Sequence, residues 1–324
     1  MKGPIGGFFE LEIGTGRGPY HTTAPSLHSG RACLRWILES VRPARAWVPF
    51  YICDAALEAC QVAGVAFEFY PIDEIFDPIL PAGTPAAGEC LLYVNYFGLK
   101  TATAESLVTD HPGRVIVDDT QAFFGRGYAG GWSFNSARKF FGVPDGAYAY
   151  GPGLSANEYP RVPEVHYDHL VTRLLGRQRL AYEQYLQNEA RVTADLWRMS
   201  ILSERLLAGI EYEAVRERRR LNFTALQETF GRRNCLNSRL MPDTTDVPYC
   251  YPLLSREPVP WSTLWSRDAF VPRLWPDVAE RTRAGAFARE SLLTERMMPL
   301  PVDHRYGVED LDRLGRIVCE VMGW

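Results

Sequence analysis

The sequence predicts an α/β protein, with a large domain built on a mostly parallel sheet and a smaller α+β domain after it. Three observations support this. Short β-rich runs alternate with helical patterns through the first half of the chain, a charged helical stretch without proline covers residues 165–227, and the remainder mixes short strands with a terminal helix. We place the large domain at residues 1–227, with a helical insertion at about 164–198, and the small domain at 228–324.

The elements of the first half follow in the order strand, helix, strand, helix. A helix is predicted over residues 29–41, because the apolar residues fall on one stripe and Ser29 can cap the first turn. A second helix is predicted over 54–63. Strands are predicted over five apolar runs, residues 46–51, 66–73, 90–98, 114–119 and 146–151. Apolar runs that stop abruptly are typical of buried parallel strands, and function in open α/β sheets gathers at their carboxyl ends.

The second half of the chain has a different pattern. Residues 165–227 are expected to form two or three long helices, the last leading into the small domain. Strands are predicted over "VPYCYPLL" (247–254) and "AFVPRLW" (269–275), and an amphipathic helix over "VEDLDRLGRIVCEVM" (308–322).

The composition excludes several classes of protein. A net charge of −4 and a pI near 5.9 argue against nucleic acid as a partner. No apolar run approaches the roughly 18 residues of a membrane span, and the first residues lack the apolar core of a signal peptide. The seven cysteines are scattered without metal-binding spacing, and His166 and His169 lack a third ligand, so no metal is expected. We expect a cytoplasmic protein with reduced thiols.

One lysine stands out in a chain that otherwise uses arginine. Of 35 lysines and arginines, only Lys2, Lys100 and Lys139 are lysines. Lys2 is terminal, and Lys100 follows "NYFGL" in an expected loop, where solvation explains it. Lys139 lies inside "SFNSARKFFGVPDG". A lysine that must lose its proton to form an imine cannot be replaced by arginine, which favours a covalent role for Lys139. A surface charge is the alternative interpretation.

Two further clusters fall where such chemistry needs them. Asp118 follows the strand run "RVIV", and a buried carboxylate there needs a partner such as a protonated ring nitrogen. A surface turn with solvated acids is the alternative. The segment Ser29–Ala32 opens a predicted helix, whose free amides can bind phosphate. Taken alone, the segment is better explained as an ordinary helix cap. Together with Lys139, these clusters form a consistent site for pyridoxal 5′-phosphate, in which the acid keeps the ring protonated as an electron sink.

At these residues the sequence resembles the DegT/StrS-type sugar aminotransferases, which have the fold-type-I architecture of pyridoxal phosphate enzymes. The similar segments are, in order, "LHSGRACLRWIL", "VPFYICDAALEACQVAGVAFEFYPID", "VIVDDTQAFF", "SARKFFGVPDGA" and "LPVDHRYGVEDLDRL". The resemblance implies that Lys139 binds the cofactor covalently. The cofactor-binding residues that it implies are Gly30, Arg31, Ala32 and Ser136 at the phosphate, Asp118 at the ring nitrogen and Gln121 near the ring hydroxyl. The resemblance does not fix the aromatic residue that stacks on the ring, and we expect Tyr51 there.

The resemblance also implies a function, namely a pyridoxal phosphate-dependent aminotransferase of sugar or polysaccharide biosynthesis that acts on a nucleotide-linked keto sugar with an amino-acid donor such as glutamate. A homodimer with its active site at the interface is implied as well. Arg31 stands where threonine is usual, and the histidine common before the lysine is missing. Two alternatives therefore stay open, namely an inactive regulatory or scaffold protein of the same fold, and a pyridoxal phosphate enzyme, such as a lyase, acting on an amino acid.

Overall fold

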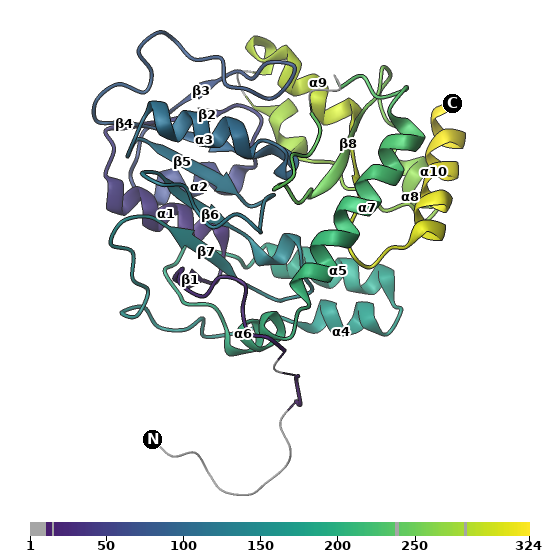
Figure 1. Cartoon of the computed structure of the whole chain (residues 1–324), viewed down its shortest axis with the longest axis horizontal. Helices are drawn as coiled ribbons and strands as arrows, with labels where there is room; N and C mark the ends of the chain where they lie inside the picture. Colours follow the sequence, from purple (N-terminus) through teal and green to yellow (C-terminus); the bar gives the residue numbers. More distant parts are fainter. Residues whose placement is uncertain (1–10, 15, 237–239, 282–283) are drawn as a thin grey trace, which may run out of the picture.

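The computed structural model describes residues 11–14, 16–236, 240–281 and 284–324. Within them, seven strands form one sheet (Figure 1). Its strands, in spatial order, are β1 (Ser26–Leu27), β7 (Ala147–Tyr150), β6 (Trp132–Asn135), β5 (Val115–Asp119), β4 (Glu89–Val94), β2 (Arg45–Pro49) and β3 (Phe67–Tyr70). The strands from β6 to β3 are parallel, whereas β7 and β1 run antiparallel to their neighbours. The predicted α/β fold with a mostly parallel sheet is confirmed.

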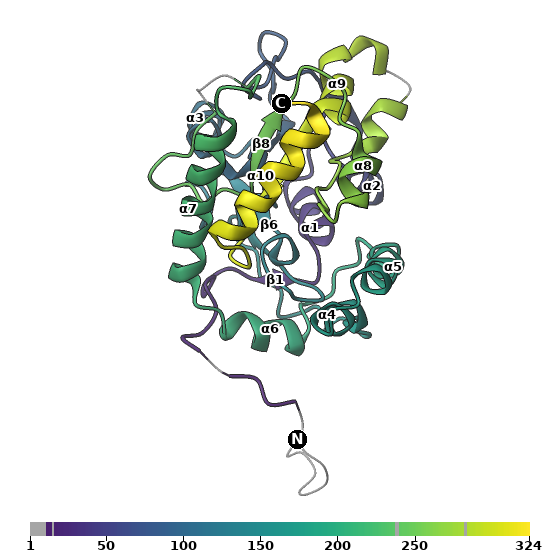
Figure 2. The ribbon, with the colours of Figure 1, turned by 90° about the vertical axis from the view of Figure 1, so that its right-hand side faces the viewer.

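Helices cover both faces of this sheet. α1 (Gly30–Val41) and α2 (Asp54–Val62) pack against each other on one face, and α3 (Thr101–Asp110) lies on the other (Figures 1 and 2). Every residue of β5 is buried, as expected for a strand covered on both faces. The parallel strands therefore bring their carboxyl ends to one edge of the sheet. At that edge Asp118 pairs in register with Phe134, and Asp119 with Asn135.

α3, β6 and the two-residue strand β1 were not predicted from the sequence. α3 has only two buried residues, Ala104 and Val108, and its apolar stripe is therefore weak. β6 is only four residues long, too short for an alternating pattern to stand out. The five predicted strands are present but shorter than expected. The run at 90–98, for example, leaves the sheet after Val94 and turns through a short 3₁₀ helix, η1 (Tyr96–Gly98).

The expectation of two or three long helices over 165–227 is wrong. The stretch forms α4 (Asp168–Leu174), α5 (Gln178–Glu189), α6 (Ile201–Ala208) and α7 (Tyr212–Phe230), of which only α7 is long. Gly176, in the left-handed region at φ 77°, interrupts the helical conformation between α4 and α5. These two helices pack against each other as a hairpin.

The C-terminal part centres on a two-stranded antiparallel sheet of β8 (Cys250–Leu254) and β9 (Met297–Pro301). α8 (Trp261–Ser266), α9 (Ala288–Arg296) and α10 (Val308–Met322) surround it, and α10 has the bounds predicted for the terminal helix. The predicted strand at 269–275 is wrong. Trp275 has φ 46°, far from an extended conformation, and Pro272 lacks the amide that a sheet needs. The missed β9 has the sequence "MMPLP", whose two prolines hide it.

α7 connects the two parts of the molecule (Figures 1 and 2). It contacts β8 and α10, and its bounds, Tyr212–Phe230, run across the boundary expected at residue 227. That division into domains stays a prediction. A hydrophobic cluster rich in aromatic rings packs between the amino-terminal end of α7 and the segment around Lys139. It includes Phe123, Phe124, Phe140, Phe141, Tyr148 and Tyr212. None of the described helices is long and apolar enough to cross a membrane.

Candidate active site

Lys139 lies at the carboxyl edge of the sheet, on the segment that follows β6. It ends the single turn η2 (Ala137–Lys139), which is anchored because the Ala137 amide donates to the Gly146 carbonyl at 2.9 Å, and the Gly146 amide to the His28 carbonyl at 2.7 Å. The amine of Lys139 donates a hydrogen bond to the hydroxyl of Thr120, with Nζ and Oγ1 2.8 Å apart. The lysine is therefore held over the end of β5.

Asp118 reaches the same threonine from the sheet. Its carboxylate is 4 % exposed, and its Oδ1 accepts a hydrogen bond from the Thr120 amide at 2.9 Å. The neighbouring Asp119 is buried as well, so the interpretation of this segment as a solvated surface turn is wrong. Lys139 and Asp118 thus contact one residue, Thr120. The charges of both also act on the thiol of half-buried Cys53, just before α2, whose pKa is raised chiefly by burial.

The start of α1 closes against Thr120 from a third side. A Cβ on Gly30 would lie 3.2 Å from Cγ2 of Thr120 and 3.4 Å from the Asn135 carbonyl oxygen, so only glycine fits without displacement. Ser29 caps the helix through the Ala32 amide at 3.1 Å. In the described part of the chain, the amides of Gly30 and Arg31 have no hydrogen-bond partner. Free amides at a helix start, beside a lysine, suit an anion such as phosphate.

The side chain of Arg31 turns away from this helix start. Its Nη1 pairs with Glu58 at 2.7 Å and donates to the Val192 carbonyl at 2.6 Å, while its Nε is buried without a partner. The Val192 carbonyl belongs to the segment after α5, and Ser29 also donates its hydroxyl to the Thr193 carbonyl, at 3.3 Å. The chain after the α4–α5 hairpin therefore covers the outer side of the start of α1.

The hairpin itself is tied to the lysine segment. Arg138, next to Lys139, forms an ion pair with Glu189 at the end of α5. Burial lowers the pKa of the Arg138 guanidinium, and the nearby charge of Arg31 acts in the same direction. The expected insertion at 164–198 thus contains two helices whose far end holds the residue beside the candidate catalytic lysine.

Two predicted cofactor residues, Gln121 and Ser136, lie in or beside turns of the backbone. Gln121 is 1 % exposed, and its side-chain oxygen accepts from the Phe97 amide at 2.6 Å, which stabilises the left-handed turn at Phe97 (φ 60°). Ser136 immediately precedes η2, and its hydroxyl makes no capping hydrogen bond there. The structure brings both residues to the carboxyl edge of the sheet; their roles at a ring hydroxyl and at a phosphate stay predictions.

Tyr51 is fully buried rather than open to a ligand. Its ring lies 4.6 Å from Trp275, edge-on, and 6.0 Å from Tyr96, stacked, and its hydroxyl has no hydrogen-bond partner in the described residues. Burial raises the pKa of this phenol. Stacking of Tyr51 on a cofactor ring, as the sequence predicts, requires movement of Trp275.

Arg281 fixes the loop that carries Tyr51. Its guanidinium donates to the carbonyls of Phe50 and Ile52 and pairs with Asp54 and Asp277 at 2.7 and 2.8 Å. Only 10 % of this side chain is exposed. The segment 275–281 from the C-terminal part is therefore fastened to the loop between β2 and α2. Sequence reasoning missed Arg281, because nothing local distinguishes it from the other arginines.

Thr120 was also missed, although its position offers a signal. Side chains two residues apart point to the same side of a strand, so a residue two after a buried strand-end acid lies beside that acid. The two described lysines, Lys100 and Lys139, have different partners. Lys100 is 8 % exposed and pairs with Asp77 at 2.6 Å, so its expected solvation is wrong. Within the described residues, the amine of Lys139 instead meets a neutral hydroxyl.

These residues fit pyridoxal 5′-phosphate. Within the described residues, a primary amine without a carboxylate partner, a buried acid and two helix amides without a partner lie around Thr120, and Gly30 lets the start of α1 pack closely against that residue. Among the described residues, no cluster of three or more side chains suited to a metal ion occurs.

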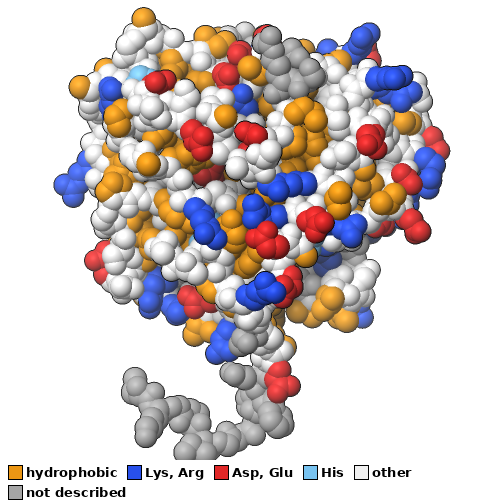
Figure 3. Space-filling view, viewed as in Figure 1, with side chains coloured by type: hydrophobic (Ala, Val, Ile, Leu, Met, Phe, Trp, Pro, Cys, Tyr) orange, Lys and Arg blue, Asp and Glu red, His pale blue; other side chains and the backbone are white. Residues whose placement is uncertain are grey.

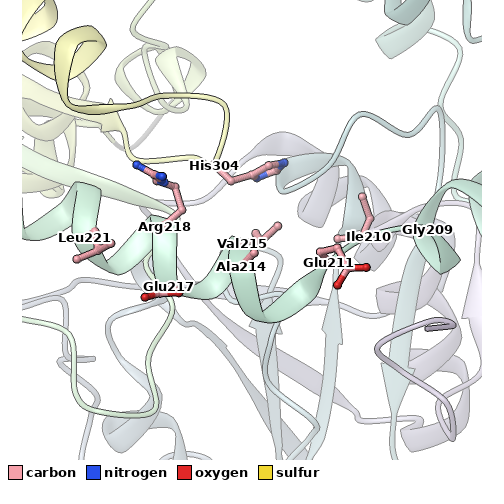
Figure 4. Close-up of a pocket in the computed structure, with 9 residues that line it drawn as sticks. All are labelled: Gly209, Ile210, Glu211, Ala214, Val215, Glu217, Arg218, Leu221 and His304. Carbon is pink, nitrogen blue, oxygen red and sulfur yellow. The ribbon is translucent and has the colours of Figure 1, made fainter. Parts of the chain in front are cut away.

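A groove lies elsewhere on the molecule. It has a volume of about 510 Å³ and runs along the first turns of α7, with His304 from the loop after β9 on its opposite side (Figure 4). The ring of His304 lies 6.0 Å from that of Phe141, so the groove meets the aromatic cluster beside the lysine segment but does not include Lys139.

No protein-family model matches the chain, and no curated protein matches it in sequence. Solved structures do match. The aminotransferase TlmJ from Streptoalloteichus hindustanus is 13 % identical, with a TM-score of 0.67 over 95 % of this chain and 92 % of that one. The putative sugar aminotransferase Spr1654 from Streptococcus pneumoniae, in its PMP form, is 13 % identical, with a TM-score of 0.63 over 94 % and 88 %.

A DegT DnrJ EryC1 StrS aminotransferase from Brucella abortus is 14 % identical, with a TM-score of 0.60 over 93 % of this chain and 86 % of that one. The chain therefore has the fold of the DegT/DnrJ/EryC1/StrS aminotransferases.

Proposed function

We propose that this protein is a pyridoxal phosphate-dependent aminotransferase that transfers an amino group from an amino acid such as glutamate to a nucleotide-linked keto sugar. The observation that carries the proposal is the meeting of Lys139 and Asp118 at Thr120, which packs against the start of α1. The sugar aminotransferases of the same fold support the substrate class.

Each residue has a distinct part in this proposal. Lys139 supplies the amine that holds the cofactor and moves protons during transfer. Asp118, buried at the end of β5, holds a proton on the ring nitrogen, and the amides of Gly30 and Arg31 bind the phosphate. The cofactor supplies the electron sink that the side chains lack.

Cofactor binding is tested first. The purified protein, incubated with pyridoxal phosphate, is expected to gain a visible absorption band, and borohydride followed by peptide mass spectrometry is expected to place the cofactor on Lys139. Lys139→Ala should lose the band. Lys139→Arg, which keeps the charge but not the nucleophile, should lose it too. A colourless wild-type protein that takes up no cofactor overturns the proposal.

Transfer is tested on the loaded protein. L-glutamate is expected to convert the bound cofactor to its amino form and release 2-oxoglutarate, and a panel of nucleotide-linked keto sugars then identifies the acceptor by return of the original spectrum. A scaffold protein gives no conversion with any donor. A lyase releases product without accumulating the amino form, so the three functions give three different results.

We also propose a homodimer, in which the α4–α5 hairpin takes part in the contact. Large apolar side chains cluster on this hairpin (Figure 3, lower right): Tyr167, Val171, Leu174, Leu175, Leu180, Tyr182, Tyr185 and Leu186, each at least 38 % exposed. Such a patch is typical of an interface. Leu174→Glu with Leu175→Glu should shift the mass measured by light scattering to that of a monomer, whereas Ile201→Glu, at an exposed site outside the hairpin, should not.

All seven cysteines lie in the described residues and none is paired. This supports our proposal that the protein works in the cytoplasm, where thiols stay reduced. The net charge of −4 supports small molecules rather than nucleic acid as its substrates.

A further inference from the structure

Thr120 directs its hydroxyl, its amide and its methyl group at the candidate site. Its hydroxyl accepts from Lys139 Nζ at 2.8 Å, and its amide donates to Asp118 Oδ1 at 2.9 Å. Its Cγ2 is the atom that a Cβ on Gly30 would meet, at 3.2 Å. Lys139, Asp118 and Gly30 therefore all contact Thr120.

The branched side chain explains why the hydroxyl cannot easily turn away. A threonine has few χ1 rotamers, and a rotation that moved Oγ1 would also move Cγ2 out of its place against the start of α1. The residue is 9 % exposed, so water has little access to compete for the hydroxyl. The position of the lysine amine is thereby fixed relative to both Asp118 and the free amides of α1.

We propose that Thr120 is a positioning residue for the amine of Lys139. The inference rests on the proposed function, since it concerns the approach of this amine to a cofactor aldehyde. By accepting one N–H, the hydroxyl fixes the direction of the nitrogen lone pair. The amine needs this direction to attack, and needs it again each time the donor displaces it and it carries a proton. A lysine has four rotatable side-chain bonds, so without the hydroxyl the amine samples many directions.

Two substitutions separate the hydroxyl from the methyl group. Thr120→Val keeps the branched shape against Gly30 and removes the hydrogen bond to Lys139. Thr120→Ser keeps the hydroxyl and removes the methyl contact. If the hydroxyl positions the amine, Thr120→Val should slow cofactor uptake, followed by the visible band, by roughly tenfold to a hundredfold, while Thr120→Ser stays within about threefold of wild type. In turnover, kcat should fall for the valine variant with KM for the donor unchanged.

A second readout needs no cofactor. In the cofactor-free protein, the labelling rate of Lys139 by a small acylating reagent is compared with that of Lys100, which keeps its Asp77 partner in every variant and serves as the internal standard. Thr120→Val is expected to change the Lys139 to Lys100 ratio, and Thr120→Ser to leave it near the wild-type value. Circular dichroism and unfolding midpoints confirm that the variants are folded.

The outcomes distinguish the two levels of the argument. Equal uptake and equal labelling ratios in wild type and Thr120→Val overturn the positioning role and leave the aminotransferase proposal intact. A wild-type protein that takes up no cofactor ends the proposed function, whatever the labelling ratio shows. Equal losses in Thr120→Val and Thr120→Ser also overturn the inference, because they assign the effect to packing against Gly30.

Discussion

The guanidinium carbon of Arg219 lies 4.3 Å from the centre of the Phe140 ring, directly beside Lys139. Arg219 is 1 % exposed and donates to the carbonyls of Pro248, Tyr249 and Phe140, at 3.2, 3.1 and 3.5 Å, and no carboxylate of the described residues is in hydrogen-bonding contact with it. Burial lowers its pKa to about 10, and the charge of Asp303 acts in the opposite direction. A buried cation on α7 thus holds the lysine segment and the residues just before β8 together.

Replacing Arg219 should cost stability and disturb the lysine segment. Arg219→Met fills the same space but leaves buried carbonyls without donors, which should lower the free energy of unfolding by about 3 kcal/mol, measured by urea titration of the cofactor-free protein. Cofactor uptake should slow as well, because Phe140 loses its contact. Arg218→Met, at the exposed neighbouring position, is the control and should change neither quantity. Equal midpoints for the two variants would contradict this prediction.

Gly30→Ala should weaken cofactor binding with little effect on the fold. The added Cβ pushes on Thr120 at 3.2 Å, and strain of about 1–3 kcal/mol corresponds to roughly tenfold to hundredfold weaker binding in a spectroscopic titration. Gly315→Ala is the matched control, because its Cβ meets Thr229 at an ordinary 3.5 Å inside α10. That variant should bind the cofactor normally and gain up to about 1 kcal/mol of stability. Normal cofactor affinity in Gly30→Ala would argue against a phosphate at the start of α1.

The parts of this site that the sequence predicts are those with a local signature. Asp118 ends an apolar run, Lys139 is conspicuous among arginines, and Gly30 opens an amphipathic helix. Residues that act by distant contact leave no such trace. Arg281 reaches Asp54 from 227 positions away, and Arg219 reaches Phe140 from 79, so their roles depend on how the chain folds back.

The same reasoning explains the errors in the fold. A run of helical residues shows where helices form but not where a glycine such as Gly176 interrupts them. The apolar run at 269–275 resembles a strand, yet it lacks a neighbouring strand to pair with, and the Trp265 indole instead donates to the Val271 carbonyl at 3.0 Å. Strand formation depends on pairing, which local sequence does not encode.

Asp119 should make stability depend on pH. Burial raises the pKa of this carboxyl to about 7, against hydrogen bonds from Asn95 and Tyr128 that lower it; Asp118 and Asp246 add to the increase. The folded state therefore binds its proton more tightly than the unfolded state, whose pKa is 3.8. The stabilisation is complete below that value and is lost as pH rises through about 7.

Asp119→Asn is expected to remove this pH dependence. The new amide oxygen can still accept from Asn95 and Tyr128, which both donate to Oδ1 at 3.0 and 2.9 Å. Urea midpoints measured between about pH 4 and about pH 8 should fall less steeply in this variant than in wild type. Asp110→Asn, at an exposed site, should keep the wild-type slope, and a parallel slope in Asp119→Asn would show that Asp119 does not titrate there.

Arg281 is expected to protect Cys53. Asp277 has a raised pKa because of burial and the neighbouring Asp54. The charged forms of these two acids therefore depend on Arg281, which pairs with both. Arg281→Ala should free the segment 275–281 from the loop after β2 and speed alkylation of the Cys53 thiol, followed by peptide mass spectrometry. Arg267→Ala, which breaks an exposed pair with Glu320, is the control. Unchanged labelling of Cys53 would show that the loop stays closed without the arginine.

α7 has a mechanical consequence for the whole molecule. Arg219 on this helix holds the lysine segment, and Asn222, one turn later, donates to the carbonyls of Val302, Asp303 and Tyr306 in the loop that carries His304. A helix of 19 residues moves as a rod. A ligand that displaced the His304 loop would therefore also move the segment that carries Lys139. The shape of the groove and the position of the amine would then change together.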